Sequence, residues 1–214
     1  MQNNVKQHLD DLIARYPALT VCADDIAAAY EMLYTCYQNG GKLLACGNGG
    51  SAADSEHIVG ELMKGFMLPR RLHASARAEI ARAAGGDADF IADSLQGALP
   101  AISLVSHTAL STAFANDVAP DMVFAQQVYG YAKPGDVLIG ISTSGNSKNV
   151  LYAAKVAKAR GAGVIAMTGQ NGGLLASVCD VTIQAPTSST PEVQEYHLPV
   201  YHTLCMMVET AFFG

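Results

Sequence analysis

The fold is decided by one stretch of the chain, Val137-Leu138-Ile139-Gly140-Ile141-Ser142-Thr143-Ser144-Gly145-Asn146-Ser147. An apolar run ends abruptly in hydroxyl side chains, a glycine and an asparagine. From residue 149 to residue 160 the apolar positions then follow helical spacing. This pattern predicts a strand that leads into a helix through a short loop rich in hydrogen-bond donors. Such a loop points backbone N–H groups at one place, where the helix dipole favours negative charge, so the expected ligand is a phosphate or another small anion. The loop lacks the Gly-Lys-Ser/Thr ending of a Walker motif.

A second loop of the same kind precedes it, Gly47-Asn48-Gly49-Gly50-Ser51. It follows the apolar run 42–46, and helical spacing resumes from residue 52 to residue 66. Small residues let the backbone approach a ligand, and Ser51 could cap the helix. One glycine-rich turn is often only a turn, but two at strand ends in one domain predict a site for a polyhydroxylated, phosphorylated small molecule. A nucleotide is less expected, because the chain has no GxGxxG motif and no spaced acidic residue for a ribose.

Strands and helices alternate along the whole chain of 214 residues. The strands are expected at 42–46, 99–105, 137–141, 163–168 and 178–184, and the helices at 5–16, 24–37, 52–66, 108–115, 121–131, 149–160 and 191–213. This order predicts a single α/β domain over residues 1–214, with a five-stranded parallel sheet covered by helices on both faces. Residues 1–40 are expected to form an N-terminal helical extension. Ligands of such sheets bind beyond the carboxyl ends of the strands, where both loops fall.

Residues 68–98 are expected to be an insertion of uncertain structure, in which Gly85-Gly86 separates two short helices. Four arginines gather there, Arg70, Arg71, Arg77 and Arg82. One interpretation is a surface excursion with solvated charges. The alternative is a cap over a neighbouring subunit's ligand site.

Composition excludes several classes of function. The formal charge of −6 and the absence of a Lys/Arg run argue against a nucleic-acid partner. The five cysteines stand singly, so neither a thiolate zinc site nor a redox motif is indicated. No stretch is long and apolar enough for a membrane helix, and the N-terminus has no signal-peptide pattern. A cytoplasmic protein is therefore expected.

Two helices carry side chains suited to chemistry. His57 and Glu61 are four residues apart and share a helix face, while Gln194 and His202 lie about 80° apart around the last helix. Pro199 between them removes a backbone hydrogen bond and predicts a kink. Each residue alone is typical of a surface or internally satisfied group, so only their convergence on one crevice would make a site. Two histidines, a glutamate and an amide would also suit a zinc ion with an open position.

Taken together, these pieces resemble the sugar isomerase (SIS) domain family and, within it, the phosphoheptose isomerases. The resemblance is carried by the following motifs: Gly47-Asn48-Gly49-Gly50-Ser51, His57-x-x-x-Glu61-Leu62, Leu99-Pro100-Ala101-Ile102, Asn116-Asp117, Gly140 to Ser147, Thr168-Gly169, and Gln194-Glu195-x-His197 followed by His202. It implies that the N-terminal helices pair subunits, and that homotetramers form with sites at subunit boundaries.

The resemblance also implies a role for each matching residue. The catalytic residues would be Glu61 and His202. The substrate-binding residues would be Asn48, Gly49, Gly50, Ser51, Asn116, Asp117, Ser142, Thr143, Ser144, Ser147 and Gln194. A zinc ion, bound in some members, would be held by His57, Glu61, Gln194 and His202.

The implied reaction is aldose–ketose isomerisation of a phosphorylated sugar, sedoheptulose 7-phosphate to D-glycero-D-manno-heptose 7-phosphate, through an enediol. Glu61 would serve as base and His202 as acid, with zinc as a possible Lewis acid. One alternative is an isomerase of another ketose phosphate. Another is a non-catalytic SIS protein that binds a sugar phosphate or a protein partner such as the replication initiator. Such binders lack equivalents of Glu61 and His202, and both are present here, which favours catalysis.

Overall fold

Five parallel strands form the centre of the computed structural model, which describes residues 1–214. Their order across the sheet is β2-β1-β3-β4-β5, with bounds β1 Leu43–Gly47, β2 Ala101–Ser103, β3 Val137–Ile141, β4 Gly163–Thr168 and β5 Val181–Gln184. The predicted five-stranded parallel sheet is confirmed. β2 and β5 are shorter than predicted; at β2, Pro100 has no N–H to contribute to a ladder.

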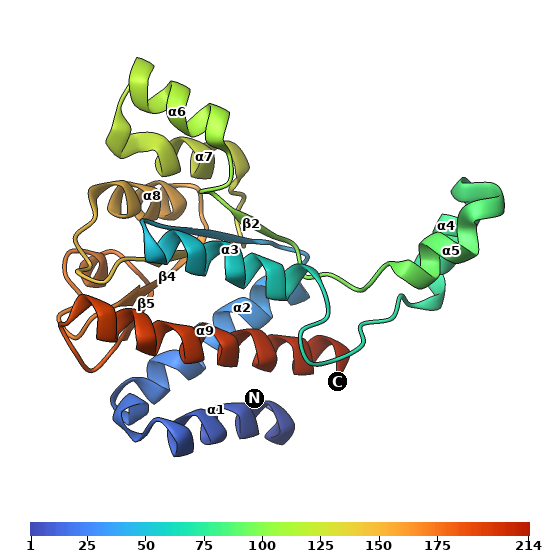
Figure 1. Ribbon diagram of the computed structural model, residues 1–214, viewed down its shortest axis with the longest axis horizontal. Coiled ribbons are helices and arrows are strands. Elements are labelled where there is room, and N and C mark those ends of the chain that lie inside the picture. Colours follow the sequence, from blue (N-terminus) through green and yellow to red (C-terminus); the bar gives the residue numbers. More distant parts are fainter.

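Helices cover both faces of this sheet (Figure 1). On one side lie α1 Asn3–Arg15, α2 Ala23–Gln38, α3 Gly50–Met63 and α9 Thr190–Phe213; on the other lie α6 Thr108–Asp117, α7 Val123–Tyr131 and α8 Lys148–Ala159. Successive residues of β3 alternate between the two cores: Val137 and Ile139 belong to the α1/α2/α3/α9 side, and Leu138 belongs to the α7/α8 side. A strand that is buried on both faces reads as a continuous apolar run, which is why β3 could be predicted.

Short 3₁₀ turns connect several of these elements, at Pro17–Cys22, Gly85–Asp87, Pro120–Met122 and Leu175–Ser177. The N-terminal helix α1 packs along α9, so the first and last helices of the chain lie side by side. None of the helices combines the length and the apolar character needed to span a lipid bilayer.

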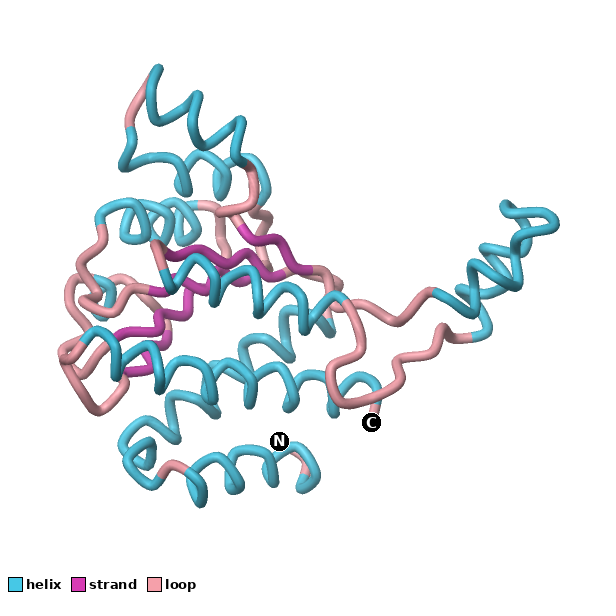
Figure 2. Tube along the Cα trace, viewed as in Figure 1, coloured by secondary structure: helices cyan, strands magenta, loops and turns pink.

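Helices α3 and α9 run parallel to each other, and residues of α3 and just beyond it face residues of α9 that come 143 or 144 positions later in the chain. His57 contacts Tyr201, 144 residues later in the chain, and Phe66, just beyond α3, contacts Glu209, 143 residues later. α9 is continuous through Pro199 (Figure 2), whose missing N–H falls one turn after the exposed Glu195. The two helices that carry the predicted chemistry therefore meet along one seam.

Residues 68–98 form an arm that projects from the body (Figure 2). As predicted, it contains two short helices, α4 Ala74–Ala84 and α5 Ala88–Ser94, which pack mainly on each other. Its base is closed by an antiparallel bridge between Arg71 and Gln96.

One arginine of the segment is not solvated, contrary to the interpretation of solvated charges. The side chain of Arg70 is fully buried, and its Nε donates to Glu209 Oε1 at 2.7 Å. Its other nitrogens donate to the carbonyl oxygens of Leu62, at 2.6 Å, and Glu61, at 2.9 Å. Burial is possible because a carboxylate and the free carbonyls at the C-terminus of α3 satisfy the guanidinium.

Candidate functional site

The loop after β3 folds into a compact cradle. Ser142 Oγ donates to Ser147 Oγ at 3.0 Å, and the Gly145 N–H donates to the Ser142 carbonyl at 2.9 Å. Gly145 has a φ of +66°, and a Cβ there would lie 2.0 Å from the Gly172 carbonyl oxygen, so only glycine fits. Ser144 stays exposed and Thr143 half-buried. Ser147 is the N-cap of α8 and makes no side-chain cap bond, so the first turn of α8 keeps N–H groups for an anion.

The glycine loop after β1 lies against this cradle. The side-chain amides of Asn48 and Asn149 exchange two hydrogen bonds, at 2.9 and 2.8 Å, and so join the two loops. The predicted cap is wrong in position: Gly49, with a φ of +58°, is the N-cap of α3, and Ser51 is buried within the first turn. The glycine starts the helix two residues earlier than a cap at Ser51 would.

Gln194 belongs to the same region. A Cβ on Gly50 would lie 2.6 Å from Gln194 Nε2, so the bare glycine makes room for this amide. His197, one turn further along α9, hydrogen-bonds through Nε2 to the Thr168 carbonyl at the end of β4, at 3.2 Å. Burial lowers the pKa of His197 to about 4, so its ring is neutral and serves as an anchor between α9 and the sheet.

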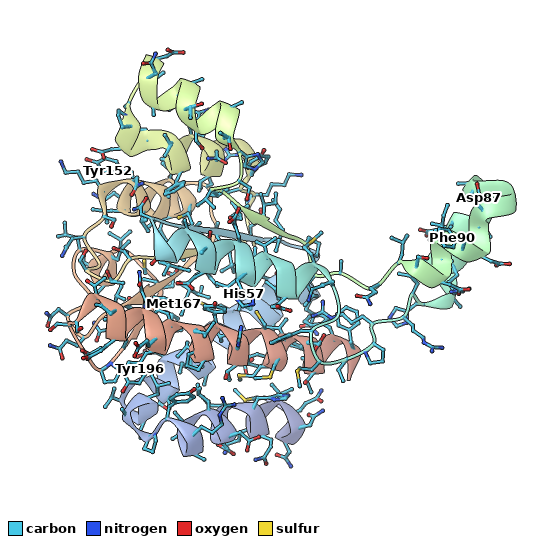
Figure 3. All side chains as sticks on the ribbon, in the orientation of Figure 1. His57, Asp87, Phe90, Tyr152, Met167 and Tyr196 are labelled. Carbon is cyan, nitrogen blue, oxygen red and sulfur yellow. The ribbon has the colours of Figure 1, made fainter.

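His57, Glu61 and His202 form a second polar group further along the seam. His57 Nε2 lies 3.2 Å from Glu61 Oε1, and the His57 and His202 rings meet edge to face with centroids 4.9 Å apart. Figure 3 places His57 between α3 and α9. Glu61 is mostly covered, and its other oxygen accepts from Lys64 at 2.9 Å. Burial and, to a smaller extent, the charge of His57 lower the pKa of His202, whose buried Nε2 has no hydrogen-bond partner.

The predicted site residues therefore fall into separate groups within one chain. Gly50 and Glu61 are eleven residues apart on α3, which corresponds to about 16 Å along a helix. Asn116 and Asp117 are exposed at the C-terminus of α6 and hydrogen-bond to each other at 2.8 Å, with no bond to either loop. Gln194 faces the cradle and His202 faces His57, so the prediction that both lie on one side of α9 is confirmed.

Two residues of the seam were missed as site residues by reasoning from the sequence. Tyr201 is almost fully buried, and its hydroxyl donates to Asp54 Oδ1 at 3.3 Å and bonds to His57 Nδ1 at 3.0 Å. Burial raises the pKa of both Asp54 and Tyr201. The spacing of Asp54, His57 and Glu61 along one helix face could have found the aspartate; only the packing of α9 on α3 reveals the tyrosine.

The four predicted zinc ligands do not form a metal site within one chain. No three His, Cys, Asp or Glu side chains lie close enough together to hold a metal ion. His57 Nε2 faces Glu61, and Gln194 lies two turns from His202, beside Gly50.

A model of the SIS domain matches residues 9–89 and 73–169 of the chain. The chain belongs to the SIS domain family.

Individual relatives narrow the class. A phosphoheptose isomerase from Geotalea daltonii is 41% identical over 189 residues, covering 88% of this chain and 85% of that protein. One from Rhodospirillum rubrum is 38% identical over 190 residues, covering 89% and 87%. The solved structure of the phosphoheptose isomerase from Neisseria gonorrhoeae superposes with a TM-score of 0.73 at 34% identity, covering 98% of each chain. Within the SIS domain family, the chain belongs with the phosphoheptose isomerases.

Proposed function

We propose that this protein is a phosphosugar aldose–ketose isomerase that converts sedoheptulose 7-phosphate to D-glycero-D-manno-heptose 7-phosphate. The observation that carries the proposal is one seam between α3 and α9. It bears the anion-binding loops at one end and a carboxylate beside an unpartnered imidazole, Glu61 and His202, further along. The phosphoheptose isomerase relatives support the choice of substrate.

Each group of residues has a task in this reaction. The hydroxyls of the cradle and the first-turn N–H groups of α8 bind the phosphate. Glu61, an ionisable acceptor held by His57 and Lys64, takes the proton from one carbon of the enediol pair and returns it to the other. His202 Nε2, buried and without a partner, hydrogen-bonds the oxygen on which charge develops. A neutral imidazole is suited to that task, and burial favours the neutral form.

The Glu61→Gln variant tests the role of the carboxylate. The substitution keeps the size and one acceptor oxygen but removes the base, so we expect isomerisation of sedoheptulose 7-phosphate to fall by at least the 10²–10⁴-fold range of general-base catalysis. Substrate binding, followed by calorimetry, should persist. Full activity in this variant would remove Glu61 from the mechanism.

A panel of ketose phosphates separates the alternatives. Exchange of substrate protons with solvent, scored for pentulose, hexulose and heptulose phosphates, should be fastest with the heptulose phosphate. Faster exchange with a shorter sugar would support the isomerase of another ketose phosphate. Binding without exchange across the panel would support the non-catalytic sugar-phosphate binder.

We propose that the working unit is a homotetramer with sites shared between subunits. The separation of about 16 Å between the glycine loop and Glu61 supports this, because one small sugar must reach both. The family resemblance supports the tetramer itself. Light scattering should give about four times the chain mass of 22.4 kDa; a monomer would contradict the proposal.

Zinc binding is proposed through His57, Glu61, Gln194 and His202. The unpartnered Nε2 of His202 and the neighbouring His57 supply nitrogen donors, although the ligand set is not preformed in one chain. Elemental analysis of the wild type and of His57→Ala tests this. Equal zinc content in the two proteins would refute the assignment.

We propose that the protein works in the cytoplasm. Its five cysteines are free, and four of them are buried, which suits a reducing compartment. Cell fractionation with an antibody to the protein would test this.

A further inference from the structure

The last turn of α3, which carries Glu61, ends without its usual backbone hydrogen bonds. In a continuing helix the N–H group of Gly65 would donate to the carbonyl oxygen of Glu61. Here it donates instead to Gln96 Oε1, at 2.7 Å. The next N–H group, that of Phe66, donates to Glu209 Oε1 at 2.8 Å and is equally lost to the helix. The carbonyl of Glu61 therefore needs a donor from outside α3.

The buried guanidinium of Arg70 is that donor. Its Nη2 donates to the Glu61 carbonyl at 2.9 Å, and its Nη1 donates to the Leu62 carbonyl at 2.6 Å. The guanidinium is itself fixed by α9, because Nε donates to Glu209 Oε1 at 2.7 Å and the group lies over the ring of Phe213, 4.8 Å from its centroid. One planar group thus joins the backbone of Glu61 to the C-terminal end of α9.

The carboxylate of Glu61 makes no such link. Its two partners are His57, on α3 itself, and Lys64, the residue that ends α3, so both move with the end of the helix. The bond from Arg70 is the hydrogen bond that ties Glu61 to a part of the fold outside α3 and its cap.

We propose that Arg70 is a positioning residue: its guanidinium fork, held by Glu209, fixes the backbone of Glu61 and so places the carboxylate on the seam. A lysine at this position would keep a positive charge beside Glu209 but would present one nitrogen where the arginine presents three. The end of α3 would then be free to fray, and Glu61 would move with it. The step from a fixed backbone to a faster reaction rests on the function proposed above.

Carbonyl ¹³C NMR tests the contact without any substrate. A Glu-Leu pair occurs only at Glu61-Leu62, so labelling glutamate with ¹³C at its backbone carbonyl and leucine with ¹⁵N gives a single, assigned carbonyl signal. Loss of a hydrogen bond shields a carbonyl carbon, so this signal should move upfield in Arg70→Met and in Arg70→Lys. The lysine variant keeps the ion pair and is the better folded of the two. An unchanged Glu61 signal in Arg70→Lys would overturn the proposal.

Asp136→Asn is the matched control for a general loss of stability. The Asp136 carboxylate is buried and pairs with Lys42, and it lies just before β3, at the end of the strand opposite to the cradle. This variant should be less stable than the wild type but should keep the Glu61 carbonyl signal in place. An upfield move as large as that of Arg70→Lys would show that the signal reports lost stability and would overturn the assignment to Arg70.

Kinetics tests the consequence for the reaction, at a temperature where circular dichroism shows each variant to be folded. A misplacement of about 1 Å can cost about 100-fold in rate, so Arg70→Lys should lower kcat by about 10- to 100-fold and leave KM within about twofold. Asp136→Asn should keep the wild-type kcat. A merely structural role would lower the folded fraction of Arg70→Lys and leave kcat per folded chain unchanged, and that result would overturn the positioning role. So would an equal loss of kcat in the control.

The two measurements also separate this proposal from the function on which it rests. A wild type inactive towards every ketose phosphate would overturn the proposed function. The Glu61 carbonyl signal would still decide whether Arg70 holds the backbone of Glu61.

Discussion

At the scale of single residues, His197 gives the fold a dependence on pH. Its ring is buried and neutral, with a pKa lowered to about 4, whereas in the unfolded chain it titrates near 6.5. Between these values the unfolded state binds more protons, so the contribution of this residue is complete above about pH 6.5 and is lost as the pH falls towards 4. This lowering of the pKa corresponds to a contribution of about 3 kcal/mol to the free energy of unfolding.

Urea unfolding at pH 7 and at pH 4.5 measures this effect. We expect the wild type to lose about 2–3 kcal/mol more between the two pH values than His197→Gln, which cannot charge. His73→Gln, at an exposed position on the arm, should behave like the wild type. If the wild type and His197→Gln lost the same unfolding free energy between the two pH values, the His197 ring would not be the cause of the pH dependence.

Arg70 is the second single residue whose substitution should measurably lower the free energy of unfolding. It holds Glu209, which also accepts the N–H groups of Phe66 and Met67 at 2.8 and 2.7 Å. Removing one partner of a buried pair leaves an uncompensated charge, so Arg70→Met should destabilise the protein by about 3–5 kcal/mol in denaturant unfolding. Arg77→Met breaks the exposed pair with Asp93 and should cost less than about 1 kcal/mol. Equal costs would contradict the burial argument.

At the scale of elements, the cradle after β3 depends on Gly145. An alanine there would combine a φ of +66° with a Cβ 2.0 Å from the Gly172 carbonyl, so the loop must open. We expect Gly145→Ala to lose the rise in melting temperature that a saturating sugar phosphate gives the wild type. Gly130→Ala, in α7 with nothing near its Cβ, should keep that rise and gain about 0.5–1 kcal/mol of stability. Ligand protection of Gly145→Ala equal to that of the wild type would show that the cradle does not bind the ligand.

The arm can be separated from the body on the same reasoning. Because α4 and α5 pack mainly on each other, replacing residues 74–94 by a short Gly/Ser turn across the Arg71–Gln96 bridge should leave circular dichroism of the body and its melting temperature nearly unchanged. Loss of folding would mean that the arm contributes to the core. The kinetics of this variant separate the two interpretations of the arm: an unchanged kcat/KM fits a surface excursion, and a lowered one fits a cap over a neighbour's site.

What could be predicted from the sequence follows from how local each signal is. The buried strand at 137–141 and the helices around it have periodicities that a window of residues contains, and they are found as predicted. The arrangement of the site depends on pairs far apart in the chain, such as Gly50 with Gln194 or Asp54 with Tyr201. Arg70 reads as a solvated charge because its partner, Glu209, lies 139 residues away. Only the packing of α9 supplies these contacts.

At the scale of the whole molecule, the separation of the cradle from Glu61 has a direct consequence. Gly50, in the glycine loop that lies against the cradle, is about 16 Å from Glu61 along α3, whereas the phosphate and the reacting carbons belong to one small sugar. If one subunit supplies the cradle and another supplies Glu61, then two variants that are inactive for different reasons should complement each other. Gly145→Ala disrupts the cradle but retains Glu61. Glu61→Gln removes the base but retains the cradle.

Random mixing of the two chains in one oligomer leaves about a quarter of the sites with an intact cradle from one subunit and an intact carboxylate from the other, since each has a probability of one half. Co-expression of the two variants should therefore recover about a quarter of wild-type activity per site, while each variant alone stays inactive. Mixing the purified proteins without subunit exchange provides the control and should recover nothing. Activity that stays at the level of the single variants, in oligomers shown by mass to contain both chains, would mean that each subunit builds its site alone and that the sugar reaches Glu61 within one chain.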